Sequence, residues 1–237
     1  MKTSIEGRRA LITGAGSGIG RAVAQRLSEL GCDVVLVGRT GATLNETAAL
    51  CPGITKTVTC DLTDENSILA LVGYIRATGG LDILVNNAGV VQSGPLEGIS
   101  TKEFDAVMAT NVRAPFILMR ETLPLLKASP APEIINVCSV VAHEGYPNQS
   151  AYVASKHALC GLSKSFAKEV FEDGIRVHLI SPGGVLTDMV AKVRPEIVGV
   201  PMIAPEDVAD AAEYLLTHRS DAVCDEIRLH RVTKAPF

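Results

Sequence analysis

The 237-residue sequence has no tryptophan, and only 4% of its residues are aromatic. An aromatic platform for stacking nucleotide bases is therefore not expected. Basic blocks are also lacking, and the formal net charge of −4 gives no electrostatic reason to expect binding to nucleic acid or to an anionic membrane. No apolar run reaches the length of a membrane span, and no signal-peptide-like stretch precedes Thr13. We therefore expect a cytoplasmic protein with no membrane or nucleic-acid partner.

The six cysteines form no CxxC pair, and none has the spacing to histidine that is typical of a zinc site. Cys60, Cys138 and Cys160 lie inside apolar runs. This usage predicts reduced, mostly buried thiols and no metal centre.

Short apolar runs alternate with amphipathic stretches along the whole chain, and 47% of the residues are hydrophobic, enough for a sizeable core. The pattern predicts strands at 9–12, 33–37, 54–60, 81–85, 133–138, 176–180 and 226–229. It predicts helices at 18–30, 43–50, 64–77, 101–127, 151–171 and 205–217. Gly31 should end the first helix, Thr63 or Asp64 should cap the third, and Pro115 should kink or break the long fourth helix.

Strands that are apolar on both faces, each followed by a helix, predict a parallel sheet covered on both sides. We therefore expect an α/β fold: one doubly wound Rossmann domain over residues 1–237, with about seven parallel strands flanked by helices. Ligands of such sheets bind at the carboxyl ends of the strands, so the turns after the strands are where the chemistry is expected.

The first of these turns reads Thr13-Gly14-Ala15-Gly16-Ser17-Gly18-Ile19-Gly20, between a strand and a helix. Glycines there allow the backbone to approach a pyrophosphate, and the helix N-terminus offers free N–H groups and a positive dipole end. The context favours a dinucleotide site over a turn that merely connects two elements.

The second strand ends in Gly38-Arg39, where an NAD-selective dehydrogenase usually has an acidic residue for the ribose 2′-hydroxyl. A guanidinium suits a 2′-phosphate instead, which predicts NADP(H) as the cofactor. The alternative is that Arg39 is an ordinary solvated surface residue.

A possible catalytic pair opens the helix after the fifth strand, in Tyr152-Val153-Ala154-Ser155-Lys156. Positions i and i+4 share a helix face, and a nearby ammonium stabilises the phenolate form of a tyrosine. Such a tyrosine can exchange a proton with a substrate oxygen. Ser139 ends the fifth strand, thirteen positions earlier. Alone, the pair could be an exposed Tyr–Lys pair, and Ser139 could simply bond its own turn.

The order of the motifs resembles the classical short-chain dehydrogenase/reductase family over about residues 8–188, including members like 3-oxoacyl-acyl-carrier-protein reductases and carbonyl reductases. The similarity rests on the pattern T-G-x-x-x-G-x-G, Asp61-Leu62, Asn86-Asn87-Ala88-Gly89, Asn111, Ser139, the Y-x-x-x-K pair, and Pro182-Gly183-Gly184-Val185-Leu186-Thr187. Every motif falls at the expected end of the predicted sheet.

The resemblance implies roles for individual residues. The catalytic group would be Asn111, Ser139, Tyr152 and Lys156, with Asn111 supporting a water near Lys156. The residues implied in cofactor binding are Gly14, Ser17, Gly18, Ile19, Gly20, Arg39, Asp61, Leu62, Asn87, Ala88, Gly89, Tyr152, Lys156, Pro182, Gly183, Val185 and Thr187. Each segment also has a plain structural interpretation: Asp61 as a helix cap, the Asn-Asn-Ala-Gly and Pro-Gly segments as turns, and Asn111 as a buried side chain that satisfies helix backbone.

The resemblance weakens after Asp188. Residues 189–202 are expected to form a short, apolar substrate lid, and the tail from Asp225 lacks the glycine-rich segment with which many members end. In the family this tail region packs subunits together and shapes part of the substrate wall. We still expect a homodimer or homotetramer. His143 could be a second acid, although loop residues are usually solvated.

The sequence thus predicts an NADP(H)-dependent oxidoreductase that transfers a hydride between nicotinamide and a small carbonyl compound or secondary alcohol. A ketone or 3-oxoacyl reductase comes first. The alternatives are a dehydrogenase of a small hydroxy acid or sugar and, from a different class, a catalytically silent NADP-binding protein.

Overall fold

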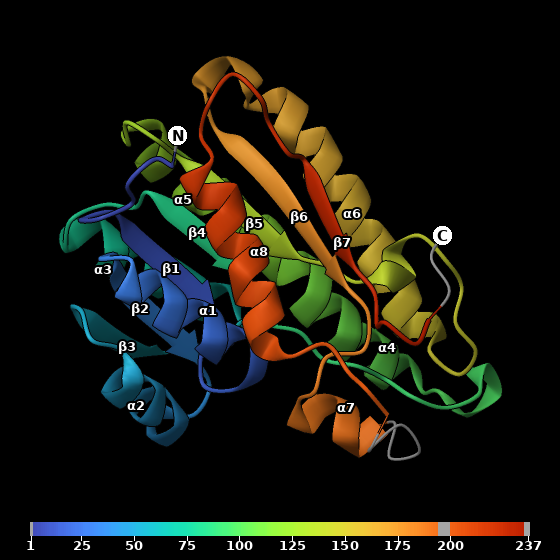
Figure 1. Ribbon diagram of the computed structural model, residues 1–237. Coiled ribbons are helices and arrows are strands. Elements are labelled where there is room, and N and C mark those ends of the chain that lie inside the picture. Colours follow the sequence, from blue (N-terminus) through green and yellow to red (C-terminus); the bar gives the residue numbers. More distant parts are fainter. Residues whose placement is uncertain (1, 194–199, 235–237) are drawn as a thin grey trace.

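A computed structural model describes residues 2–193 and 200–234. Its centre is a parallel sheet in the strand order β3-β2-β1-β4-β5-β6-β7. Figure 1 shows β3 at one edge and β7 at the other. The strands are β1 (Arg9–Thr13), β2 (Asp33–Gly38), β3 (Thr55–Thr59), β4 (Ile83–Asn86), β5 (Glu133–Val137), β6 (Arg176–Pro182) and β7 (Glu226–Leu229). The predicted doubly wound α/β fold is confirmed.

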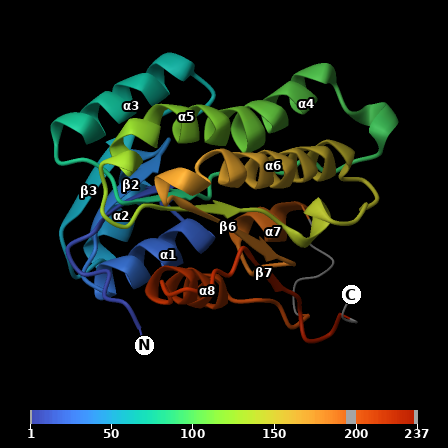
Figure 2. The ribbon, with the colours of Figure 1, turned by 90° about the horizontal axis from the view of Figure 1, so that it is seen from above.

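Helices cover both faces of the sheet, as seen from above in Figure 2. α1 (Gly18–Glu29) and α8 (Pro205–Thr217) lie on one face, and α3 (Glu65–Ala77), α5 (Ala114–Lys127) and α6 (Ser150–Glu169) lie on the other. The remaining helices are α2 (Gly41–Leu50), α4 (Thr101–Met108) and α7 (Asp188–Val193), with short 3-10 turns at Leu96–Gly98, Val140–Ala142 and Phe171–Asp173.

The core has two layers because successive strand residues point to opposite faces. Ile12 and Leu36 pack in the layer with α1 and α8, whereas their neighbours Leu11 and Val35 pack in the layer with α3 and α5. All four side chains are fully buried or nearly so. The central strands are therefore apolar on both faces, as expected for a parallel sheet covered on both sides.

The expectation of one helix over 101–127 with its irregularity at Pro115 is wrong in detail. The break is a π-helical segment at Ala109–Arg113, between α4 and α5. Pro115 lies in the first turn of α5, directly after this segment. Single π-helical turns occur often at functional positions, and this one has Asn111 at its centre.

The predicted helix ends are largely confirmed. α1 stops at Glu29, and Gly31 follows with a φ of 86°, which favours glycine. Asp64, not Thr63, caps α3, and its carboxylate accepts from the backbone N–H groups of Asn66 and Ser67. β6 is two residues longer than predicted, so Pro182 is its last residue and pairs with β7 rather than starting a turn.

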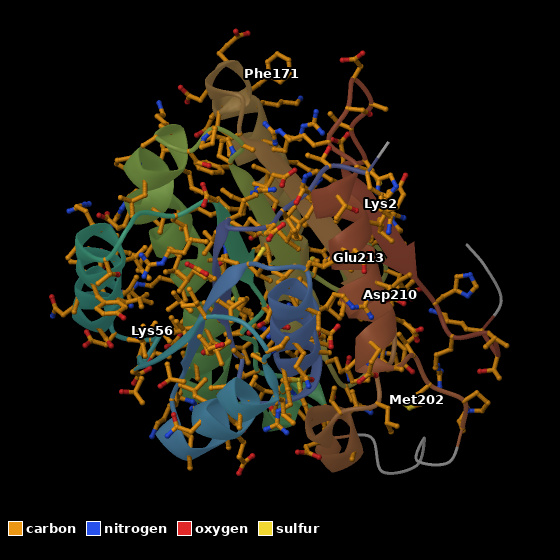
Figure 3. All side chains as sticks on the ribbon, turned by 60° about the vertical axis from the view of Figure 1, so that its left-hand side comes forward. Lys2, Lys56, Phe171, Met202, Asp210 and Glu213 are labelled. Atoms are coloured by element: carbon orange, nitrogen blue, oxygen red, sulfur yellow. The ribbon has the colours of Figure 1, made fainter. Side chains whose placement is uncertain are left out.

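The amino-terminal arm is held against α8. Lys2 makes an ion pair of 2.9 Å with Glu213, and both residues are labelled in Figure 3 together with Asp210 of the same helix. Within the described ranges, no helix is long and apolar enough to cross a membrane. The six cysteines are all unpaired.

Candidate active site

The glycine-rich turn after β1 depends on two glycines in different ways. Gly14 adopts a φ of 66°, which is strained for other residues. Gly20 brings the start of α1 against the turn, because a Cβ there would lie 2.2 Å from the carbonyl oxygen of Gly14. Ser17 precedes α1 without a side-chain capping bond, so that cap leaves the first backbone N–H groups of the helix free for an anion.

Three hydrogen bonds join the end of β1, where this turn begins, to the end of β4. The hydroxyl of Thr13 accepts from the backbone N–H groups of Asn87 and Ala88, both at 3.0 Å. The side-chain amide of Asn87 donates to the carbonyl of Thr13 at 2.9 Å. Asn87 therefore holds two neighbouring strand ends together.

A groove of about 500 Å³ runs along the carboxyl ends of the strands. It is lined by every residue that the sequence analysis assigned to the cofactor except Gly20, which packs beneath the turn. The expected cofactor residues in the lining are Gly14, Ser17, Gly18, Ile19, Arg39, Asp61, Leu62, Asn87, Ala88, Gly89, Tyr152, Lys156, Pro182, Gly183, Val185 and Thr187. The sequence motifs converge on one continuous surface.

One end of the groove is polar and carries Arg39. This exposed guanidinium faces Asp61, whose pKa is lowered first by hydrogen bonds from the N–H and hydroxyl of Thr63 and then by the charge of Arg39. Asp61 thus forms a turn with Thr63 and does not cap α3. Thr40 and Thr43, at the start of α2, also line this end and were missed. Their only sequence signal was the predicted start of a helix at residue 43.

Tyr152 and Lys156 lie one helical turn apart near the start of α6, and both line the groove. The Lys156 ammonium nitrogen lies 5.7 Å from the centre of the Tyr152 ring. Lys156 is only 4% exposed, and its ammonium donates to the carbonyl of Val137 at 2.9 Å. An ammonium has three donors, so two remain for other partners. The expected pairing is therefore present, and it is not an exposed surface pair.

Ser139 lies two residues beyond β5 and is buried. Its hydroxyl accepts from the N–H of Val141 and donates to the carbonyl of Pro182, both at 3.3 Å. Ser139 thus bonds its own turn, as one interpretation of the sequence had it. It also lines the same groove as Tyr152, so that interpretation is incomplete. The hydroxyl is fixed by its own loop and by the end of β6.

Asn111 does not line the groove; it supports the groove from behind and is 1% exposed. Its side-chain oxygen accepts from the N–H of Val90, and its amide donates to the carbonyl of Val90, both at 2.8 Å. The same amide donates to the hydroxyl of Ser155 at 3.0 Å. Asn111 therefore forms hydrogen bonds with the backbone of the loop after β4 and links that loop to α6. These bonds do not involve the backbone of its own helix.

His143 is directed to β7. Its Nε2 lies 2.6 Å from a carboxylate oxygen of Glu226, which also accepts from the hydroxyl of Ser181. Burial acts to raise the pKa of Glu226, but hydrogen bonds from Arg228, Ser181 and His143 lower it overall. With His143 engaged in this way, the structure favours a structural role for it over a second acid.

A second cavity, of about 230 Å³, opens beside Tyr152. Tyr152, Ser139, Gly183, Met189 and Val190 line both this cavity and the long groove. Met189 and Val190 belong to the predicted lid at 189–202, of which residues 194–199 lie outside the described part of the chain. The cavity is also lined by His230, Arg231 and Lys234 of the tail, the region that shapes part of the substrate wall in the family.

The glycine turn, the long groove and the Tyr–Lys pair are the features of a dinucleotide-binding oxidoreductase. Comparison with known families agrees: the family model described as short chain dehydrogenase matches residues 8–197. The chain belongs to the short-chain dehydrogenase family.

Several known proteins are similar over most of the chain. A D-beta-hydroxybutyrate dehydrogenase of Rhizobium meliloti is 36% identical, covering 85% of this chain and 80% of its own. A 3-oxoacyl-[acyl-carrier-protein] reductase of Rickettsia bellii is 34% identical over 92% and 93% of the two chains. The crystal structure of a metagenomic short-chain oxidoreductase in complex with NADP is 34% identical, with a TM-score of 0.83 over 97% and 100%.

Proposed function

We propose that this protein is an NADP(H)-dependent oxidoreductase that reduces a ketone or 3-oxoacyl group to a secondary alcohol, or catalyses the reverse reaction. The observation that carries this proposal is the position of Tyr152 and Ser139 between two cavities. One cavity has the length and the glycine turn needed for a dinucleotide, and the other has the size of a small molecule. The side chains of Tyr152 and Ser139 line both cavities, so their hydroxyl groups would lie where cofactor and substrate meet.

The groove fits NADP(H) in its shape and its donors. The uncapped start of α1 would receive the pyrophosphate, and Arg39, with Thr40 and Thr43 beside it, would receive a 2′-phosphate. At the other end, Val185 and Thr187 would hold the nicotinamide. When bound as NADPH, the cofactor supplies a hydride to the substrate carbon. The NADP complex of the metagenomic oxidoreductase is consistent with this assignment.

The chain's own residues supply the proton. Reduction of a ketone adds a hydride to carbon and a proton to oxygen, and without that proton an alkoxide would accumulate. In our account, the hydroxyl of Tyr152 donates its proton to the substrate oxygen, and the positive charge of Lys156 stabilises the phenolate that remains. The hydroxyl of Ser139, which has one O–H donor, would exchange its 3.3 Å bond to the carbonyl of Pro182 for a hydrogen bond to the same substrate oxygen and so orient it.

The phenolate must then be reprotonated. Lys156 has donors to spare beyond its bond to Val137, so it would serve both the nicotinamide ribose and a water that leads to solvent. Asn111 and Lys156 both lie next to Gly89. The side-chain oxygen of Asn111 and the ammonium of Lys156 are each within 4 Å of the position that a Cβ on Gly89 would take. We propose that Asn111 holds the loop after β4 so that this proton route stays intact.

The small second cavity favours a small or medium substrate. We propose that α7, which contributes Met189 and Val190 to the cavity lining, covers the substrate. We also propose that the chain forms one NADP-binding domain. A dehydrogenase of a small hydroxy acid is the second candidate, because the tail adds cationic side chains to the cavity wall. The complete Tyr152, Lys156 and Ser139 set argues against a catalytically silent protein. The unpaired cysteines favour a cytoplasmic location.

The test is a panel of carbonyl compounds followed by the loss of NADPH absorbance. The panel should hold a 3-oxoacyl thioester, short oxo acids, their methyl esters and simple ketones, with the matching alcohols tested in reverse with NADP⁺. The proposal expects turnover of at least one class. If no member is turned over while NADPH binds, the proposal of a carbonyl reductase or alcohol dehydrogenase is wrong.

A further inference from the structure

The tail after β7 is fixed beside the second cavity. β6 and β7 pair as far as Pro182 and Leu229, and the N–H of Gly183 then donates to the carbonyl of Leu229 at 2.8 Å. A turn follows, in which the N–H of Lys234 donates to the carbonyl of Arg231 at 2.9 Å. The positions of Arg231 and Lys234 are therefore set by backbone contacts, and both side chains line the cavity.

The two cations on this wall differ in their partners. Lys234 pairs with Glu144 at 2.6 Å, and Glu144 lines the same cavity. Arg231 is half-buried and packs along Gly184, where a Cβ would lie 3.7 Å from its Cδ and 3.8 Å from its Nε. In the portions of the chain that the structure covers, no carboxylate pairs with the Arg231 guanidinium.

An unpaired guanidinium in a partly enclosed cavity points to an anionic ligand. Arginine stays charged at all ordinary pH values, and its planar fork matches a carboxylate with two parallel hydrogen bonds. The one carboxylate among the described lining residues, that of Glu144, already has Lys234 as its partner. Among the lining residues that the structure describes, Arg231 therefore keeps a positive charge that no paired carboxylate compensates.

We propose that Arg231 binds the carboxylate of the substrate and thereby selects short oxo acids and hydroxy acids over neutral carbonyl compounds. The proposal rests on the function proposed above and narrows its substrate class. Tyr152 and Ser139 engage the carbonyl oxygen at one side of the cavity, while Arg231 engages the carboxylate at the other. The cavity of about 230 Å³ leaves room for only a short chain between them.

Equilibrium binding tests the carboxylate site without requiring turnover. The probes are 2-oxobutanoate, 3-oxobutanoate and 4-oxopentanoate, each beside its methyl ester, titrated calorimetrically into the protein saturated with NADP⁺. We expect at least one acid to bind the unmodified protein about 10-fold or more tightly than its ester. Arg231→Ala should weaken the binding of that acid by about 10- to 100-fold, which is the effect of losing hydrogen bonds to a charged group. The binding of its ester should stay nearly unchanged.

Arg228→Ala is the matched control, because Arg228 lies three residues earlier, is exposed and pairs with Glu226 outside the cavity. It should leave the affinity for every probe unchanged. If no acid binds more tightly than its ester, including the case in which nothing binds, the proposal is wrong. It is equally wrong if Arg231→Ala weakens acid and ester alike, or if Arg228→Ala has the same effect.

Turnover of the same probes separates this proposal from the broader one. If esters and simple ketones are reduced as well as the acids, the carboxylate site is refuted while the carbonyl reductase stands. If an acid binds through Arg231 but no compound is turned over, the carboxylate site stands and the proposed reaction fails.

Discussion

The ammonium of Lys156 lies 5.7 Å from the centre of the Tyr152 ring, on the same face of α6, while one of its N–H groups is bound to the carbonyl of Val137 at the end of β5. The hydrogen bond fixes the Lys156 side chain to the end of a central strand of the sheet. It also places a buried ammonium group beside the phenol ring of Tyr152.

Replacing Arg39 by Ala should remove most of the preference for NADPH over NADH. The unmodified protein should bind NADPH more tightly, because a guanidinium forms charge-assisted bonds to a 2′-phosphate. Their loss should weaken NADPH binding by roughly 10- to 100-fold, with little effect on NADH. Fluorescence titration measures both affinities. Arg76→Ala, at the exposed end of α3, is the control and should change neither. Equal affinities for both cofactors in the unmodified protein would contradict this assignment.

Gly20→Ala and Gly73→Ala should change stability in opposite directions. A Cβ on Gly20 would lie 2.2 Å from the carbonyl oxygen of Gly14, so the turn must shift to accommodate it. We expect this shift to lower the free energy of unfolding by about 1–3 kcal/mol. Gly73 is exposed within α3 with nothing within 4 Å of its Cβ position, so alanine should stabilise the helix by roughly 0.5–1 kcal/mol. Urea denaturation measures both, and a Gly20→Ala protein as stable as the parent would show that the close approach is unimportant.

Much of the fold and site followed from local patterns. The apolar runs and the glycine turn predicted the parallel sheet. Because the carboxyl ends of parallel strands share one edge, motifs as distant as Arg39 and Thr187 could be assigned to one groove. The i, i+4 spacing alone brought Tyr152 and Lys156 to one face.

What the sequence did not reveal depends on contacts between distant segments. The π-helical segment at Ala109–Arg113 accompanies bonds from Asn111 to Val90 and Ser155, which no helix propensity encodes. Arg231 reaches the cavity only because β7 pairs with β6 and the chain then turns back along Gly184. Neither the tail's composition nor its periodicity indicated that return.

The protein should assemble as a homodimer or homotetramer. Phe104 of α4 and Phe116 of α5 are 41% and 44% exposed, and aromatic side chains are enriched where subunits meet. Sedimentation velocity at micromolar concentration should show the oligomer, and Phe116→Asp should shift it towards monomer. Leu69→Asp, on α3 with 42% exposure, is the control and should not. A parent protein that sediments only as a monomer would refute this prediction.

Lys156→Ala should impair two properties at once. Turnover should fall because the phenolate of Tyr152 loses its nearby charge, and NADPH affinity should fall because a donor to the nicotinamide ribose is lost. Steady-state kinetics and fluorescence titration measure the two separately. If NADPH affinity is unchanged, Lys156 does not contact the cofactor and serves Tyr152 alone.

The most direct test of the account is the Tyr152→Phe protein, assayed for turnover of any accepted carbonyl compound and for NADPH affinity on the same preparation. Phenylalanine keeps the ring beside Lys156 and removes only the hydroxyl group, with the proton that it carries. Turnover should fall by on the order of 10²–10⁴-fold, the usual contribution of a general acid–base group. NADPH affinity should be nearly unchanged, because the pyrophosphate is held by the turn from Gly14 to Gly20. If Tyr152→Phe instead retains near-normal turnover, the proton comes from another group and the proposed mechanism is wrong, even though the fold and the family stand.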